Sequence, residues 1–331
     1  MDNKMGLALA SGGARGAYQA GALLAVAESG LCFPSVAGTS IGSLNGAFYC
    51  TGDGSAGHME DLCTLWRAAP DAGLLEVDLS AVAKTLIKLF GRTVLPTVLE
   101  VMDKVTGKST HILDPKPVEV FLDQWIDYDR VVASKKVFFI AMIPATAMGE
   151  MTDPLRDIFE GAWRKAKYFR ASALKPEELK NALLAASAIP LAFPPRKVQG
   201  KQYTDAGLSA PLPSRVLRDE GCEYICSIFL SDTQIQNRDD YPDTTLLQIR
   251  PTEDIDPNIL TMLDFSRNTI ERLIDLGYQD ANAALAEAQK LMDLFQRFSA
   301  SGQRLEALTG SLGAKPRLVP WDCDATSQDL T

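Results

Sequence analysis

Ser40 lies at the centre of the segment GTSIG (residues 38–42), which has the spacing of a nucleophile elbow. Apolar residues precede the segment and predict a strand, and a helix-like run follows at residues 43–50. The tight turn from strand to helix crowds both sides of its central residue, so only very small residues fit at Gly38 and Gly42. Such a turn presents the serine Oγ above the sheet edge and directs the positive end of the helix at the reacting carbonyl. These residues predict a serine that attacks an acyl group.

The glycine-rich segment SGGARG (residues 11–16) could stabilise the negative oxygen that forms during such an attack. A strand-like apolar run precedes it at residues 5–10, and a helix-like apolar run follows it at residues 17–27. The backbone N–H groups of such a loop suit an oxyanion or a phosphate equally, so a nucleotide loop is the alternative. The segment nevertheless lacks both the G-x-G-x-x-G spacing of a dinucleotide site and the ending of a P-loop. A true G-x-G-x-x-G at residues 52–57 follows a helix-like run, and we interpret it as a surface loop.

A nucleophilic serine also needs a base, and the chain has only 2 histidines, His58 and His111. An α/β-hydrolase triad places its histidine late in the chain, after the nucleophile and the acid. A triad in another order remains an alternative, because geometry and not sequence order defines the constellation. Asp205 is the better candidate, since a β-prone run precedes it and Ala206-Gly207 then turns the chain. An isolated aspartate there is also typical of a turn or a helix cap, so the assignment depends on the whole set of motifs.

In chain order these motifs resemble the patatin-like phospholipases, lipid acyl hydrolases that use a serine-aspartate dyad. The glycine-rich loop, the elbow and the Asp205-Ala206-Gly207 segment are similar to the three motifs of that family. Two further blocks are similar, AASAIP followed by FPP (residues 185–195) and LGYQDA (residues 276–281). The resemblance covers most of residues 5 to about 290.

The resemblance implies that Ser40 is the nucleophile, that Asp205 is its base, and that no metal or other cofactor takes part. It also implies an oxyanion hole and a supporting set around it. The expected oxyanion hole is Gly12, Gly13, Ala14 and Ile41, and the supporting residues are Arg15, Gly16, Gly38, Gly42 and Gly207. We expect Arg15 to hold the loop or to anchor a lipid phosphate.

The sequence departs from the family pattern at two positions. Ser11 stands where many members begin the loop with a third glycine, and Ala206 stands where glycine usually follows the aspartate. If residue 206 required a positive φ, alanine there would be strained by roughly 1 kcal/mol.

For the fold, the resemblance and the strand pattern predict an α/β protein, a three-layer α/β/α arrangement with a mainly parallel central sheet and additional helices. We expect a catalytic domain at residues 1–290 with a helical insertion or lid at 74–130, and a C-terminal helical extension and tail at 291–331. A long helical stretch is predicted at about 258–308, and residues 299–302 are the place where it could break. Further strands are predicted at 136–143, 224–230 and 245–249, and a further helix at 176–188.

The formal net charge of −9 argues against nucleic-acid binding and against broad attraction to anionic membranes. The 6 cysteines lack metal-ligand spacing, and the first residues carry no secretory signal, so the sequence predicts a reducing cytoplasmic location. A lipid substrate and transient peripheral contact with a membrane are expected, and homo-oligomerisation is left open. The segment Leu74–Val105 could be an interfacial helix or lid, or an ordinary helical pair packed on the sheet.

The sequence thus predicts a carboxylic ester hydrolase of phospholipase A or lysophospholipase type, acting on phospholipids or related lipids. Two alternatives stay open. One is an effector held inactive until a partner or ligand activates it, and the other is a non-catalytic, lipid-binding member of the fold.

Overall fold

The computed structural model describes residues 4–72, 116–145, 166–188, 193–207, 209–231, 234–253, 255, 262 and 264–311, with side chains up to residue 290. The chain divides into two compact units, Met1–Leu285 and Ala286–Thr331. The segment predicted as a lid, Leu74–Val105, lies outside the described residues. Of the wider insertion predicted at 74–130, the structure describes α6 (Lys116–Trp125) and part of α7 (Tyr128–Ala133).

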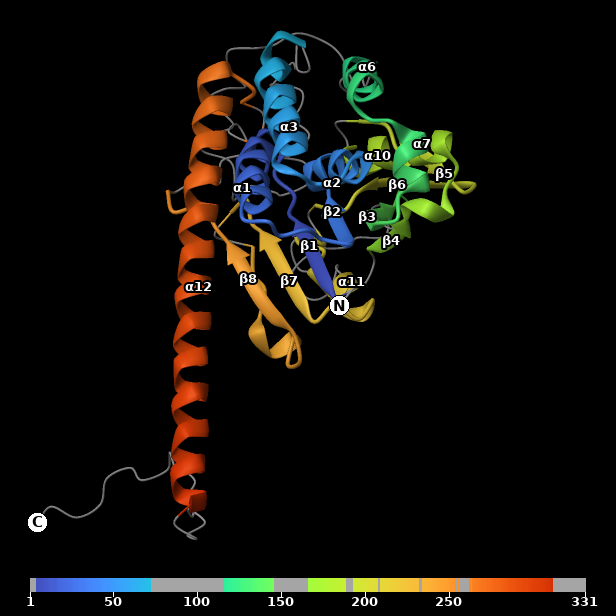
Figure 1. The fold of residues 1–331 in the computed structure, drawn as a ribbon. Helices are drawn as coiled ribbons and strands as arrows, with labels where there is room; N and C mark the ends of the chain where they lie inside the picture. The colour runs from blue at the N-terminus through green and yellow to red at the C-terminus, as the bar shows by residue number, and fades with distance from the viewer. Residues whose placement is uncertain are drawn as a thin grey trace, which may run out of the picture. The chain divides into compact units, whose positions relative to one another are not determined.

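An eight-stranded sheet forms the centre of the first unit, in the order β5-β6-β3-β2-β1-β7-β8, with β4 paired to β3 (Figure 1). Five of its strands are parallel to one another, and the other three run antiparallel to their neighbours, so the predicted mainly parallel sheet is confirmed. The parallel strands are β1 (Met5–Leu9), β2 (Ser35–Thr39), β3 (Val137–Pro144), β7 (Tyr224–Ile228) and β8 (Thr245–Ile249). The antiparallel strands are β4 (Lys167–Arg170), β5 (Arg196–Val198) and β6 (Lys201–Asp205).

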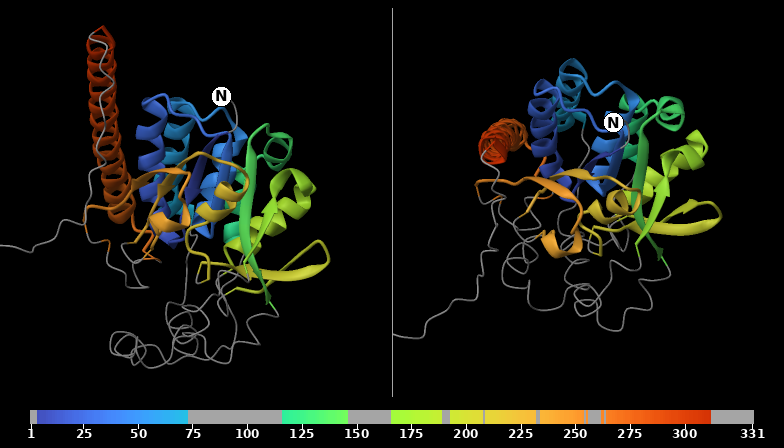
Figure 2. Two further views of the ribbon diagram at one scale, coloured as in Figure 1. Left: turned by 90° about the horizontal axis from the view of Figure 1, so that it is seen from below. Right: turned by 60° about the horizontal axis from the view of Figure 1, so that its bottom comes forward.

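The two faces of the sheet have different cores because successive side chains of a strand point to opposite sides. Leu7 and Leu9 of β1 belong to the larger core, where helices cover one face, whereas Ala8 belongs to a smaller core on the other face, beneath Leu217 of α11. Figures 1 and 2 show the helices of the larger layer together on one side of the sheet and α11 on the opposite side. The larger layer includes α1 (Gly16–Glu28), α2 (Ile41–Thr51), α3 (Ala56–Ala68) and α10 (Pro176–Ala186), and the smaller one α11 (Ser214–Asp219). This arrangement confirms the predicted three-layer α/β fold.

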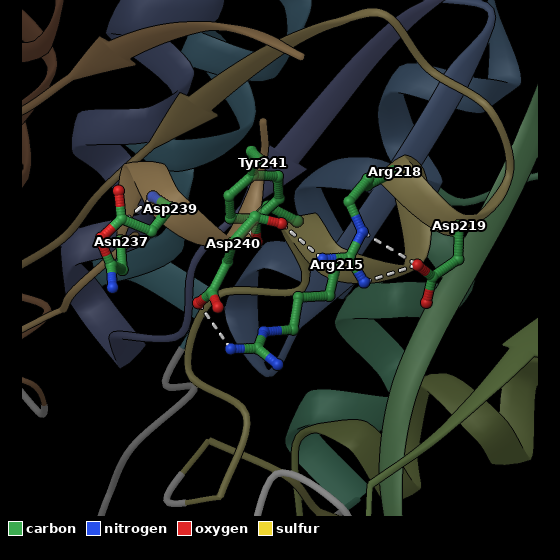
Figure 3. Close-up of polar contacts among 8 residues, drawn as sticks. Arg215, Arg218, Asp219, Asn237, Asp239, Asp240 and Tyr241 are labelled. Carbon is green, nitrogen blue, oxygen red and sulfur yellow. Dashed lines mark hydrogen bonds and ion pairs between the residues drawn. The ribbon is translucent and has the colours of Figure 1, made fainter. Parts of the chain in front are cut away.

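Polar contacts attach α11 to the short 3-10 helix η6 (Arg238–Asp240) (Figure 3). The Arg215 guanidinium pairs with the Asp240 carboxylate at 2.6 Å, and Arg218 donates to the Asp240 carbonyl at 2.5 Å. The hydroxyls of Ser214 and Tyr241 lie 2.7 Å apart and are buried. These contacts hold both ends of the short helix α11, which follows the loop that leaves Asp205.

One continuous helix, α12 (Arg267–Ser311), occupies most of the predicted long helical stretch. Residues 264–266 are not helical, so the helix begins later than predicted, and it continues without a break through residues 299–302. Within the first unit, α12 packs closely on α1: a Cβ at Gly277 would lie 2.0 Å from the Tyr18 carbonyl oxygen. The buried Asp280 carboxylate also accepts from the Tyr18 hydroxyl at 3.0 Å. No helix among the described residues is both long and apolar enough to cross a membrane.

Candidate active site

Ser40 occupies a strained turn between β2, which ends at Thr39, and α2, which begins at Ile41. Its backbone has φ 55° and ψ −127°, and Gln199 is the only other described non-glycine residue with a positive φ. The turn leaves no space beside the serine, since a Cβ at Gly38 would lie 2.4 Å from the Gly42 carbonyl oxygen. A Cβ at Gly42 would lie 2.3 Å from the carbonyl oxygen of Leu9 in β1. The structure therefore has the elbow geometry that the GTSIG spacing predicts.

Asp205 reaches the serine from the end of β6. The Ser40 hydroxyl donates to Asp205 Oδ2 at 2.6 Å. This meeting follows from strand register: Thr39 pairs with Ala141 of β3, and Asp205 pairs with Met142, the next residue of the same strand. The antiparallel β6 thus ends level with the residue that follows β2.

The Asp205 carboxyl group is enclosed by protein. It is only 5% exposed, and its Oδ1 accepts from the backbone N–H of Gly207 at 2.6 Å. Burial disfavours the charged form and raises the pKa of Asp205 to about 7, although hydrogen bonds from Ser40 and Gly207 favour the carboxylate and limit the rise. A carboxylate with a pKa near neutrality is suited to accept and return a proton at physiological pH.

The two departures from the family pattern are accommodated without strain. Ala206 does not have a positive φ, so the cost considered for alanine at that position is absent. Its side chain is buried in a small apolar cluster with Ala141, Ile143 and Ala210. Ser11 Oγ donates to the Gly207 carbonyl at 3.4 Å and thereby connects the glycine-rich loop to the aspartate segment.

The glycine-rich loop lies beside the elbow. Gly12 precedes a 3-10 turn, η1 (Gly13–Arg15), and α1 begins at Gly16. A Cβ at Gly16 would lie 2.4 Å from the Ile41 side chain, which places the start of α1 directly against the start of α2. The backbone N–H groups of Gly13, Ala14 and Ile41 stand in the first turns of η1 and α2, and none of them donates a backbone hydrogen bond to a described residue outside these helices. Unpaired N–H groups at two adjacent helix starts are what an oxyanion hole requires.

Arg15 points into the protein. Its side chain is 3% exposed, and Nη1 donates to the Leu230 carbonyl at 3.3 Å, just beyond the end of β7. Of the two roles expected for Arg15, this geometry favours holding the loop over anchoring a lipid phosphate.

Of the two histidines, the structure describes only His58, whose contacts lie at the far end of α2 from Ser40. His58 Nδ1 accepts from the Gly54 N–H, its Nε2 lies 3.2 Å from the Thr51 hydroxyl, and its ring stacks on Phe48. Thr51 ends α2 and Ser40 precedes it, so at a rise of about 1.5 Å per residue these ends are roughly 15 Å apart. His58 therefore does not contact the serine. His111 lies outside the described residues. Of the predicted surface loop at 52–57, the last two residues belong to the first turn of α3.

The sequence interpretation missed several groups that hold the site together. The Thr39 hydroxyl donates to the Ala210 carbonyl at 2.9 Å, and Gln234 Nε2 donates to the Ser11 carbonyl at 2.8 Å. Gln19 and Asn45, which are buried beside the loop, were missed as well. Thr39 lies inside the elbow segment and Asn45 lies three residues after it. Nothing in their spacing distinguishes them from ordinary strand or helix residues. The part of the chain that the structure describes contains no group of three His, Cys, Asp or Glu side chains arranged to bind a metal.

Comparison with known proteins places this chain in a family. The profile of the patatin-like phospholipases matches residues 7–218. Neuropathy target esterase sws of Drosophila persimilis and of Drosophila grimshawi are each 49% identical over 49 residues, which is 15% of this chain and 3% of each relative. The chain therefore spans only a small part of these relatives.

Two solved structures are similar at low sequence identity. Human GIVD cytosolic phospholipase A2, solved with a fluorophosphonate inhibitor, is 12% identical with a TM-score of 0.47, and the match covers 88% of this chain and 58% of that one. VipD from Legionella pneumophila is 11% identical with a TM-score of 0.38, and the match covers 85% and 67%. The family profile covers most of the chain, and the chain accordingly belongs to the patatin-like phospholipase family of lipid acyl hydrolases.

Proposed function

We propose that this protein hydrolyses fatty-acyl esters of phospholipids or related lipids with Ser40 as the nucleophile and Asp205 as its base. The observation that carries the proposal is the 2.6 Å hydrogen bond from Ser40 Oγ to Asp205 Oδ2, made by a serine held at φ 55°. A strained serine directly paired with a buried carboxylate has the geometry of an activated nucleophile.

In the first half of the cycle, Ser40 Oγ attacks the ester carbonyl carbon while its proton passes to Asp205. The carbonyl oxygen becomes negative and accepts hydrogen bonds from the backbone N–H groups of Gly13, Ala14 and Ile41, with Gly12 completing the turn. The tetrahedral intermediate collapses, the C–O bond to the lipid alcohol breaks, and that alcohol takes the proton from Asp205. An acyl ester on Ser40 remains.

In the second half, water attacks the acyl ester and gives a proton to Asp205. The same N–H groups stabilise the second oxyanion, and Ser40 leaves with the proton as the fatty acid is released. A carboxylate with a pKa of about 7 is a weak base toward a serine hydroxyl. The oxyanion donors must therefore supply much of the barrier reduction, and losing one such donor typically costs about 100-fold to 1,000-fold in rate.

Phospholipase A and lysophospholipase activities both cleave a carboxylic ester of a glycerophospholipid, and we propose this reaction type because the family profile is that of phospholipases. We keep the cytoplasmic location and the peripheral membrane contact as parts of the proposal, and homo-oligomerisation stays open.

The direct experiment incubates the protein with vesicles of mixed phospholipids and lysophospholipids and measures released fatty acids by mass spectrometry. Lipids with different acyl chains at the two glycerol positions report which ester is cleaved. We expect release by the wild type and none by Ser40→Ala. Absence of release from every lipid, together with equal vesicle binding by both proteins, would favour the non-catalytic lipid-binding alternative.

A further inference from the structure

Three buried polar side chains form a continuous hydrogen-bonded chain beneath the glycine-rich loop. Trp66 Nε1 of α3 donates to Asn45 Oδ1 at 3.0 Å, and Asn45 Nδ2 of α2 donates to Gln19 Oε1 of α1 at 2.9 Å. Gln19, Asn45 and Trp66 are at most 3% exposed. Burying polar groups costs free energy unless they are paired, so a core position for two amides calls for an explanation.

The side-chain amides of Gln19 and Asn45 donate hydrogen bonds to both ends of the loop. Gln19 Nε2 donates to the carbonyl of Ala10, the residue immediately before the loop, at 2.8 Å. Asn45 Nδ2 donates to the carbonyl of Gly16, the last residue of the loop, at 3.0 Å. Both hydrogens of the Asn45 amide are therefore used, one on the loop directly and one on Gln19.

The same network belongs to the helix that carries the nucleophile. Asn45 lies on α2, whose N-cap residue is Ser40, and a Cβ at Gly16 would collide with Ile41 and with the Trp66 ring. The loop can therefore neither move away from α2, because the amides hold its two ends, nor move closer, because there is no room.

We propose that Gln19 and Asn45 are positioning residues that set the distance between the oxyanion donors of the loop, the N–H groups of Gly13 and Ala14, and a carbonyl bound at Ser40. The inference rests on the proposed function, since it assigns these amides to the same reaction. They touch neither substrate nor reacting atoms and act only through the backbone of the loop.

The test uses Gln19→Met, which keeps the shape of the side chain and removes only its hydrogen bonds. Displacing a catalytic element by about 1 Å costs roughly 100-fold in rate, so kcat on a short nitrophenyl ester should fall by about 10- to 100-fold. KM should change by less than about twofold, because the lost interaction serves the transition state. Asn45→Asp provides an independent second variant, since it retains the bond from Trp66 but loses both donors.

Tyr49→Phe is the matched control. Tyr49 is buried on α2, the helix of Asn45. Its hydroxyl accepts from the Phe33 N–H at 3.0 Å and donates to Cys32 Sγ at 3.9 Å, so the variant loses two hydrogen bonds, neither of which reaches the loop. Its kcat should stay within about twofold of the wild type. Circular dichroism and thermal melting of each variant show that the comparison is made between folded proteins.

The outcomes separate the inference from the proposed function. Hydrolysis that is abolished in Ser40→Ala but normal in Gln19→Met and Asn45→Asp overturns the inference alone. Equal loss of kcat in Gln19→Met and Tyr49→Phe, or failure of both amide variants to fold, assigns the amides to stability and overturns it too. Hydrolysis that persists in Ser40→Ala contradicts the proposed function itself.

Discussion

The rate of ester hydrolysis should rise with pH through a midpoint of about 7, because Asp205 accepts a proton only as the carboxylate. Its carboxyl group is 5% exposed, and burial raises its pKa to about 7. With that pKa, about a tenth of the base is ionised at pH 6 and about nine tenths at pH 8, which predicts a rise of roughly tenfold in kcat/KM. An exposed aspartate, with a pKa of about 3.9, would be fully ionised throughout this range and would give no rise.

The assay measures the initial rate of hydrolysis of a short soluble ester between pH 5 and 9. Mass spectrometry quantifies the released acid. A soluble ester avoids any pH dependence of vesicle binding, and the readout does not depend on the ionisation of a dye. Histidine titrates at about 6.5 and could imitate the profile, so the control is the double variant His58→Gln/His111→Gln. In the wild type, burial lowers the pKa of His58, which further separates it from the expected midpoint.

The reasoning is refuted by a flat profile between pH 6 and 8, or by a midpoint near 4. It is also refuted if the double histidine variant folds but loses the midpoint near 7. Retention of the profile in that variant would leave Asp205 as the group that titrates.

Three further outcomes are expected. Because the folded-state pKa of Asp205 is raised, its contribution to stability is present below about pH 4 and is lost as the pH rises through about 7. The Tm of Asp205→Asn minus that of the wild type should therefore increase from pH 5 to pH 8. Calorimetry that shows no such increase contradicts the burial argument. Gly277→Ala should lower the free energy of unfolding by about 1–3 kcal/mol in denaturant titrations, because its Cβ would meet the Tyr18 carbonyl oxygen. The control Gly57→Ala, with no atom near its Cβ, should be neutral or slightly stabilising. Equal effects of the two substitutions would argue against the close packing of α12 on α1. If the segment Leu74–Val105 controls access to lipid, hydrolysis of vesicle lipids should fall far more than that of a short ester when serine replaces Ile87, Leu89 and Phe90, and equal losses would point to a core role.

Local chemistry made the nucleophile and the loop predictable. Gly38 is required for a steric reason that acts within five residues, because its Cβ would meet the Gly42 carbonyl oxygen, whereas a Cβ at Gly42 would meet the Leu9 carbonyl oxygen of β1. The tight turn itself needs both small residues, so the spacing of the motif predicts its geometry. Strands buried on both faces have continuous apolar sequences, and the predictions for β1, β3 and β7 are therefore close to the observed bounds.

Long-range register was not predictable in the same way. Asp205 lies 165 residues from Ser40 in sequence, and their meeting depends on β6 running antiparallel to β3, which no local pattern reveals. The φ of Ala206 is not predictable from local sequence either, because the surrounding turn sets it. Gln19 and Asn45 were missed because a polar residue within a helical run is ordinarily solvent-facing, and only the packing of three helices makes these two amides buried partners.

Covalent labelling with a fluorophosphonate, located by peptide mass spectrometry, tests the central claim that Ser40 is a nucleophile activated by Asp205. The account predicts a single adduct on the peptide that contains Ser40, no adduct in Ser40→Ala, and labelling slowed by at least about 100-fold in folded Asp205→Asn, in which the base is lost. An adduct on another residue, labelling that persists in Ser40→Ala, or an unchanged rate in Asp205→Asn would contradict it.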